Sequence, residues 1–151
     1  MPIYLLLIPF CPLLAFVLTL TCGRHWGERA HWLPIAGIAT SLVCALLALR
    51  DVLGGSVVNA DIHTWIASGN LRVTFGFLVD QLTAVMLVVV TSVSTLVHIY
   101  SVGYMRGEKG YYRFFAYLGL FSFSMLMLVM GNNFLQLFFG WEAVGLSSYL
   151  L

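Results

Sequence analysis

The chain has 151 residues, of which 61% are hydrophobic and 9% are charged, and its formal net charge is +1. Soluble globular chains carry about 25% charged residues, so this composition excludes an ordinary soluble domain and predicts a membrane protein. The small net charge excludes the broad basic field of nucleic-acid-binding proteins, so no nucleic acid partner is expected. Cys11, Cys22 and Cys44 lack metal-binding spacing and are interpreted as small apolar residues.

Five long apolar stretches follow one another, and each is near the length that an α-helix needs to cross a bilayer. Helices are the expected form, because every backbone polar group must be satisfied internally in lipid. The sequence therefore predicts an all-α polytopic membrane protein with about five transmembrane helices. These helices are expected at approximately residues 3–22, 33–49, 80–104, 114–130 and 133–151.

The first apolar stretch is longer than the apolar part of a secretory signal, and no Lys or Arg precedes it. Positive charge follows it instead, at Arg24 and Arg29. This arrangement predicts a retained helix with its N-terminus outside.

The long loop between the second and third stretches contains a strand-like pattern. Apolar residues at 71, 73, 75 and 77 alternate with Arg72, Thr74 and Gly76. Ser68-Gly69-Asn70 is typical of a turn, and residues 61–66 could supply the partner strand. We expect a short β-hairpin on the outer membrane surface, as a structural cap over the helices. A binding role for the hairpin is the alternative.

Two ionisable residues stand out in the third stretch. Asp80 opens it and is expected to act as an N-cap, with a role in proton exit as the alternative. His98 lies about 18 residues into the predicted helix, toward the end expected to face the cytoplasm. An imidazole titrates near neutral pH and suits a proton relay. His98 could equally be an interfacial residue beside Tyr100 and Tyr104.

The loop charges predict the orientation of the helices. The first and third loops are net positive and the second is net negative, so the first and third should face the cytoplasm or matrix. The basic residues of the two positive loops are Arg24, Arg29, Arg106, Lys109 and Arg113, against Glu28 and Glu108. The second loop contains Arg50 and Arg72 against Asp51, Asp61 and Asp80.

Glu142 lies in the otherwise uncharged fifth stretch. In a helix that starts near Asn133 it would be about 14 Å along the axis, close to the middle of a bilayer. A charged side chain there costs roughly 2.5–3.5 kcal/mol, so Glu142 is interpreted as a proton-carrying residue. A protonated glutamate that hydrogen-bonds between helices is the alternative. No Lys or Arg lies in the apolar part of the five stretches, so a cationic partner would lie outside this sequence.

The fifth stretch has barely reached spanning length at Leu151, so we expect the chain to be the N-terminal part of a longer protein. The sequence has no dinucleotide-binding fingerprint, no phosphate-binding loop and no cysteine cluster for iron–sulfur binding. Any redox chemistry is therefore expected on other chains.

Two segments link the chain to a known family. Residues 104–117 read YMRGEKGYYRFFAY and residues 140–151 read GWEAVGLSSYLL, with a pair of asparagines at 132 and 133. With them the whole chain resembles the antiporter-like membrane subunits of NADH:quinone oxidoreductase, respiratory complex I, called subunit L in bacteria and chain 5 in mitochondria. The resemblance is densest from Asp80 onward.

The resemblance implies a multi-helix proton-channel subunit within a hetero-oligomeric complex of other complex I membrane subunits. The complex would lie in the bacterial inner membrane or the mitochondrial inner membrane. The subunit would hold no redox cofactor, and NADH, FMN, iron–sulfur clusters and quinone would bind other subunits. Glu142 matches the key glutamate of the family, which pairs with a lysine on a later helix.

The function expected from these observations is that of a non-redox, proton-translocating subunit of NADH:quinone oxidoreductase. Glu142 would carry protons within the membrane and His98 would relay them. A subunit of a multi-subunit sodium/proton antiporter is the first alternative, because that group shares the glutamate motif. A structural membrane scaffold is the second.

Overall fold

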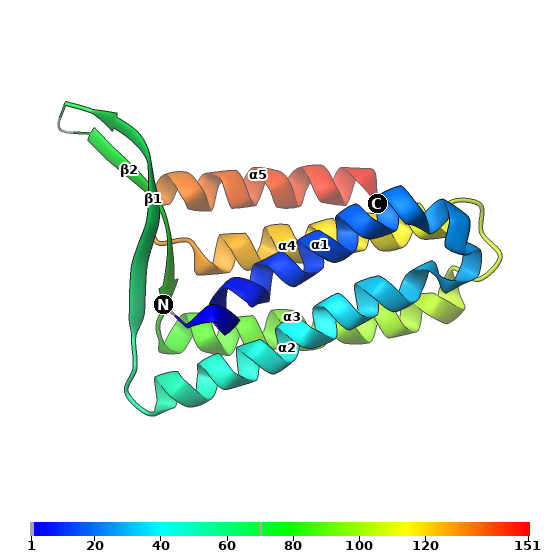
Figure 1. Ribbon diagram of the computed structural model, residues 1–151, viewed down its shortest axis with the longest axis horizontal. Coiled ribbons are helices and arrows are strands. Elements are labelled where there is room, and N and C mark those ends of the chain that lie inside the picture. The colour runs from blue at the N-terminus through cyan, green and yellow to red at the C-terminus, as the bar shows by residue number, and fades with distance from the viewer. Residues whose placement is uncertain (1, 70) are drawn as a thin grey trace.

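A computed structural model describes residues 2–69 and 71–151, and the predicted turn residue Asn70 lies outside these ranges. Figure 1 shows long helices that run side by side, with a hairpin across the end of the bundle where the N-terminus lies. The elements in chain order are α1 (Ile3–Trp26), the 3-10 helix η1 (Gly27–His31), α2 (Trp32–Leu53), β1 (Val58–Ser68), β2 (Leu71–Val79), α3 (Gln81–Tyr104), α4 (Tyr111–Met130) and α5 (Phe134–Leu150).

The predicted all-α polytopic class with a hairpin between the second and third helices is confirmed. Within the described ranges, four helices are long and apolar enough to cross a membrane, at residues 3–26, 29–53, 81–104 and 111–130. The remaining helix, α5, has 17 residues. At 1.5 Å per residue it is about 26 Å long, slightly less than a hydrocarbon core.

Several helices extend beyond the apolar stretches that predicted them. The α1 helix continues to Trp26 instead of residue 22, α2 continues to Leu53, and α4 begins at Tyr111 instead of residue 114. The added turns contain Arg24, Arg50 and other polar residues. Helical hydrogen bonding does not require an apolar side chain, and long basic side chains can reach the membrane surface from a helix end.

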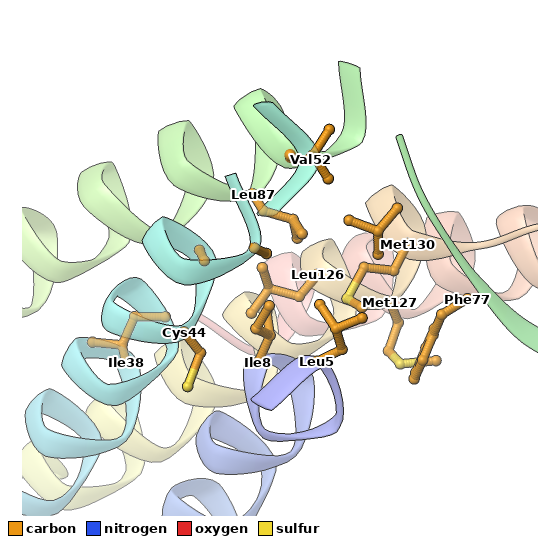
Figure 2. Close-up of a cluster of buried hydrophobic side chains, with 14 residues drawn as sticks. Leu5, Ile8, Ile38, Cys44, Val52, Phe77, Leu87, Leu126, Met127 and Met130 are labelled. Carbon is orange, nitrogen blue, oxygen red and sulfur yellow. The ribbon is translucent and has the colours of Figure 1, made fainter. Parts of the chain in front are cut away.

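The helices pack as a connected series. The α1 helix contacts both α2 and α4, α2 contacts α3, and α5 packs on α4. Figure 2 shows the main cluster of buried side chains between these helices, near the hairpin end. Phe77 of β2 is fully buried and joins Leu5, Met127 and Met130 in this cluster. The hairpin therefore contributes to the helix core.

Cys44 lies in the same cluster, whereas Cys11 and Cys22 are half-buried. All three cysteines are free thiols. Their surroundings agree with the predicted role as small packing residues.

Small residues allow the helices to approach closely. A Cβ atom added at Gly37 of α2 would lie 2.9 Å from the Cβ atom of Ala15 in α1. A Cβ atom added at Gly140 of α5 would lie 2.8 Å from the Cα atom of Leu128 in α4. Lipid is as apolar as a protein core, so membrane helices associate largely through such close van der Waals contact.

The two strands form an antiparallel pair with two irregularities in register, between Asp61 and His63 and between Thr64 and Ile66. The first strand is longer than the predicted residues 61–66 and pairs from Val58 opposite Val79. Near the helices β2 is buried, while residues 61–69 of the outer half are exposed. An isolated bridge between Phe77 and Gly131 joins the hairpin to the α4–α5 connection.

Asp80 caps α3, as predicted. Its Oδ1 atom accepts a hydrogen bond from the backbone N–H of Thr83 at 2.7 Å. Hydrogen bonds from the backbone and side chain of Thr83 lower the pKa of the Asp80 carboxyl group below its ordinary value, because they favour the charged form.

The cap predicts a pH-dependent contribution to stability. Asp80→Ala should lower the free energy of unfolding by about 1 kcal/mol at neutral pH, because it leaves the N–H groups of the first turn unpaired. The lowered pKa means that the contribution is present above the ordinary value of 3.8 and is lost as the pH falls through the lower folded-state value. Thermal unfolding in detergent from about pH 7 down to about pH 2, followed by circular dichroism, measures this difference. Asp80→Asn keeps a capping oxygen without charge, so a full acid dependence in that variant would contradict the assignment.

The close contact at Gly140 predicts a second effect on stability. Gly140→Ala should lower the free energy of unfolding by about 1–3 kcal/mol, because the new methyl group would push α5 away from the backbone of α4. Gly145→Ala on the same helix is the matched control, since an added Cβ atom there meets nothing within 4 Å. Unfolding of both variants in mixed detergent micelles compares them. Equal stability of the two variants would show that the α4–α5 contact is not close.

Candidate functional site

Glu142 lies at the centre of α5, with eight residues of the helix on either side. The helix begins after Asn133, whose side chain accepts a hydrogen bond from the backbone N–H of Gln136 at 2.9 Å. This cap fixes the first turn and therefore the position of Glu142 along the axis. A rise of 1.5 Å per residue leaves about 12 Å of helix on each side of the carboxylate.

The contact between α5 and α4 determines where Glu142 points. The buried residues of α5 are Gln136, Gly140 and Ser147, which form the stripe that faces the bundle. Glu142 is two residues beyond Gly140, which is about 200° around a helix of 3.6 residues per turn. The carboxylate is therefore exposed on the side of α5 that faces away from α4.

The face around Glu142 is apolar and open. Trp141 and Leu146 are 67% and 60% exposed, and Phe138 is 55% exposed. At Gly145 there is open space beside the helix. Within residues 2–69 and 71–151 no hydrogen-bond or ion-pair partner reaches the Glu142 carboxylate. Such a surface, with a carboxylate at its centre and a glycine one turn away, can accept a further helix.

A group of hydrogen bonds joins the hairpin to the start of α5. Asn132 donates from Nδ2 to Oδ1 of Asp61 at 2.7 Å, and Asn133 donates from Nδ2 to the carbonyl oxygen of Thr74 at 2.6 Å. The backbone N–H of Gly76 donates to Oε1 of Gln136 at 3.1 Å. We call these contacts the hairpin junction. They hold the beginning of the helix that carries Glu142.

Gln136 is a polar residue that the sequence patterns did not identify. It is 6% exposed, and among the described residues its Nε2 atom has no hydrogen-bond partner. It lines a cavity of about 550 Å³ between the hairpin, α4 and α5, which extends to Ala143 beside Glu142. The available signal was an amide within an otherwise apolar run, since a buried amide requires partners.

His98 is fully buried, and α3 packs against α4 at this level. Its Nδ1 atom lies 2.7 Å from the carbonyl oxygen of Ser94. A carbonyl oxygen only accepts, so Nδ1 carries the hydrogen and Nε2 is an acceptor. Among the described residues nothing bonds to Nε2. The hydroxyl groups of Ser94 and Ser122 hydrogen-bond to each other across the two helices beside this imidazole.

The environment of His98 differs from that of the neighbouring tyrosines. Tyr100 and Tyr104 are each 70% exposed and stack on one another with ring centroids 5.9 Å apart. His98 instead contacts the ring of Phe115 with centroids 6.4 Å apart. Its side chain therefore lies inside the bundle, on a different face of α3 from the two tyrosines.

A row of aromatic rings connects the α1–α2 turn to His98. Tyr111 lies 2.9 Å from Nδ1 of His31 through its hydroxyl oxygen, and its ring is 4.8 Å from that of Phe115. Phe115 follows in the row and contacts His98. Phe115 has no polar atom in its side chain, so this row gives close packing without a continuous hydrogen-bonded path.

The three residues singled out from the sequence lie apart in the structure. Asp80 is at the beginning of α3 and His98 is near its other end. Glu142 is on α5, and α3 and α5 pack on α4 without an extensive contact between them. Glu142 and His98 therefore lie in two separate regions, on the two sides of α4. Within the described ranges no group of His, Cys, Asp and Glu could hold a metal ion.

Comparisons with known proteins give the family. Residues 65–115 match the family model described as NADH-Ubiquinone oxidoreductase (complex I), chain 5 N-terminus. The chain is 52% identical over 150 residues to NADH-quinone oxidoreductase subunit L of Neisseria meningitidis serogroup A, covering 97% of this chain and 22% of that protein. It is 47% identical over 148 residues to NADH-ubiquinone oxidoreductase chain 5 of Arabidopsis thaliana, with the same two coverages of 97% and 22%.

A third relative covers less of the chain at similar identity. NADH-quinone oxidoreductase subunit L of Rickettsia felis is 54% identical over 115 residues, which are 76% of this chain and 18% of that protein. The chain spans about a fifth of the length of these curated relatives, with 22% for the first of them. The first two matches extend over nearly all of the helices and the hairpin. The chain therefore belongs to the subunit L and chain 5 family of complex I.

Proposed function

We propose that this chain is part of a proton-translocating membrane subunit of NADH:quinone oxidoreductase, in which electron transfer on other subunits drives protons across the membrane. The observation that best supports this proposal is the position of Glu142. Of the six acidic residues in the chain, it alone lies at the centre of a helix. Its carboxylate faces the open side of α5, where a further helix could meet it. The names of the relatives support the assignment to complex I.

The physical basis of the proposed role is the response of a carboxyl group to its surroundings. In an apolar environment the neutral, protonated form is favoured, while a nearby cation favours the carboxylate. A cation that moves toward Glu142 would therefore release its proton, and one that moves away would allow proton uptake. Such a cation would come from outside these 151 residues, since the apolar parts of the helices contain no Lys or Arg.

His98 is the second residue that we assign to proton movement. It is fully buried, its Nδ1–H donates to the carbonyl oxygen of Ser94, and its Nε2 atom is left as an acceptor. An imidazole in this state can take up a proton at Nε2 and later give it back. We propose that His98 relays protons along α3, with Ser94 and Ser122 as hydroxyl neighbours. A role for Asp80 in proton exit stays a prediction beside its capping role.

The orientation that we propose follows from the loop charges. Both basic turns, α1–α2 and α3–α4, lie at one end of the bundle and the hairpin lies at the other (Figure 1). Positively charged loops face the cytoplasm or matrix, so the hairpin and the N-terminus would face outside. We propose that the redox cofactors lie on other subunits, because the sequence has no dinucleotide-binding fingerprint and no iron–sulfur cysteine cluster.

Glu142→Gln in the full-length subunit should abolish the part of NADH-driven proton pumping that passes through this subunit, because the amide cannot take up a proton. Positioned acid–base groups typically contribute about 10²–10⁴-fold to proton-transfer rates. Acidification of inverted membrane vesicles, with NADH oxidation measured in parallel, tests this. Glu108→Gln is the matched control, since Glu108 is exposed in the α3–α4 turn.

The two alternatives have their own outcomes in the same experiment. Normal pumping and turnover in Glu142→Gln would leave Glu142 a packing residue and favour the scaffold. Proton flux that requires sodium and proceeds without NADH would favour the sodium/proton antiporter.

His98→Gln in the same full-length subunit should lower pumping and remove the part of its pH profile that depends on the imidazole. Tyr100→Phe is the control, because Tyr100 is on the exposed face of the same helix. If His98→Gln lowers the amount of assembled complex but leaves pumping per complex and its pH profile unchanged, the residue is structural and the relay assignment fails.

A further inference from the structure

The turn between α1 and α2 contains an open pocket that has no part in the proposed movement of protons. Its volume is about 840 Å³. The α1–α2 turn lies at the end of the bundle opposite the hairpin (Figure 1). The lining residues are His25, Trp26, Arg29, Trp32, Leu33 and Ala36.

The lining changes from cationic to apolar along the chain. Arg29 belongs to the 3-10 helix, and Leu33 and Ala36 belong to the first turns of α2. From Arg29 the pocket therefore extends toward the apolar part of α2. Among the described side chains no carboxylate lines it. A ligand that fits this lining has an anionic group at one end and a hydrocarbon part at the other.

Two exposed indoles lie at the cationic part of the pocket. Trp26 is 47% exposed and Trp32 is 68% exposed. An indole has a large apolar ring and one N–H donor, so it is favoured at the boundary between lipid headgroups and acyl chains. The two indoles mark the depth at which a headgroup would lie.

The surrounding charge also favours an anion. The α3–α4 turn lies at the same end of the bundle (Figure 1). The basic residues of both turns therefore concentrate positive charge at this end. The two acidic residues there, Glu28 and Glu108, offset only part of it. Arg29 is exposed, and a guanidinium can bind phosphate oxygens through two parallel hydrogen bonds. Anionic lipid headgroups are recognised by basic pockets of this kind at helix ends.

We propose that the pocket binds an anionic phospholipid. Arg29 and His25 would bind the phosphate, Trp26 and Trp32 would flank the headgroup, and one acyl chain would lie over Leu33 and Ala36. A free phosphate ion would use the cationic part alone, so the apolar part of the lining favours the lipid. The inference does not depend on the proposed proton pathway, since it uses none of the residues assigned to it.

The test uses the full-length subunit in nanodiscs of phosphatidylcholine that contain a minor share of either brominated phosphatidylglycerol or brominated phosphatidylcholine. The other tryptophans of the subunit, among them the exposed Trp65 and Trp141, are replaced by Phe, so that the fluorescence comes from Trp26 and Trp32. Brominated lipid quenches indoles that it contacts. The phosphatidylglycerol probe should quench more than the phosphatidylcholine probe at equal content. Arg29→Gln should lower this preference about fivefold, which corresponds to about 1 kcal/mol for one basic residue at an anionic surface.

Arg106→Gln is the matched control, because it removes an exposed positive charge from the same end of the bundle outside the pocket. The proposal holds if the preference is lost in Arg29→Gln, is kept in Arg106→Gln, and survives the addition of inorganic phosphate. Equal quenching by both probes in the unaltered pocket would overturn it. An equal loss in the two variants would assign the preference to the general charge of this end and also overturn it. Removal of the preference by inorganic phosphate would indicate a simple phosphate site instead. Unchanged circular dichroism spectra verify that each variant is folded.

Discussion

The close contact between Gly140 of α5 and Leu128 of α4 determines the geometry on which the proposed proton site depends. An added Cβ atom at Gly140 would lie 2.8 Å from the Cα atom of Leu128, so only glycine lets the two backbones come this near. With Gly140 toward α4, Glu142 lies about 200° further around the helix. The carboxylate is thus directed away from the bundle, toward a surface that another helix can cover. A helix rotated by half a turn would bury the same carboxylate against Leu128 without a cationic partner from this chain.

The hairpin junction fixes the beginning of the same helix, α5. Asn132, Asn133 and Gln136 each use a side chain to hold the backbone or a side chain of the hairpin. On the opposite side of the hairpin, Phe77 enters the helix core (Figure 2). The hairpin is therefore a structural cap over the helices, and it positions the first turn of α5. Since membrane helices gain little from burial of apolar surface against one another, polar junctions and close small-residue contacts carry much of the specificity.

The α4 helix is the element shared by the region around His98 and the region around Glu142. It meets α3 at His98 and Ser122, and it meets α5 at Gly140. The aromatic row from His31 through Tyr111 and Phe115 packs along its first turns. A change in the position of α4 would therefore affect both His98 and the orientation of Glu142. The α1–α2 turn at the basic end of the bundle is distinct from both regions. Its pocket has the polarity of a lipid site instead of a proton path.

The sequence by itself determined the membrane class, the number and order of the helices, the hairpin and the Asp80 cap. Each of these depends on local composition, on a period of two residues or on one capping side chain, and neighbours in sequence are sufficient to specify it. It also placed Glu142 within a helix. Only the tertiary structure decided which way Glu142 faces, that His98 is buried with no described residue bonded to Nε2, and that Gln136 binds Gly76, which is 60 residues away. These features depend on which helix faces meet, and that choice is made by contacts between distant segments, such as Gly140 on Leu128.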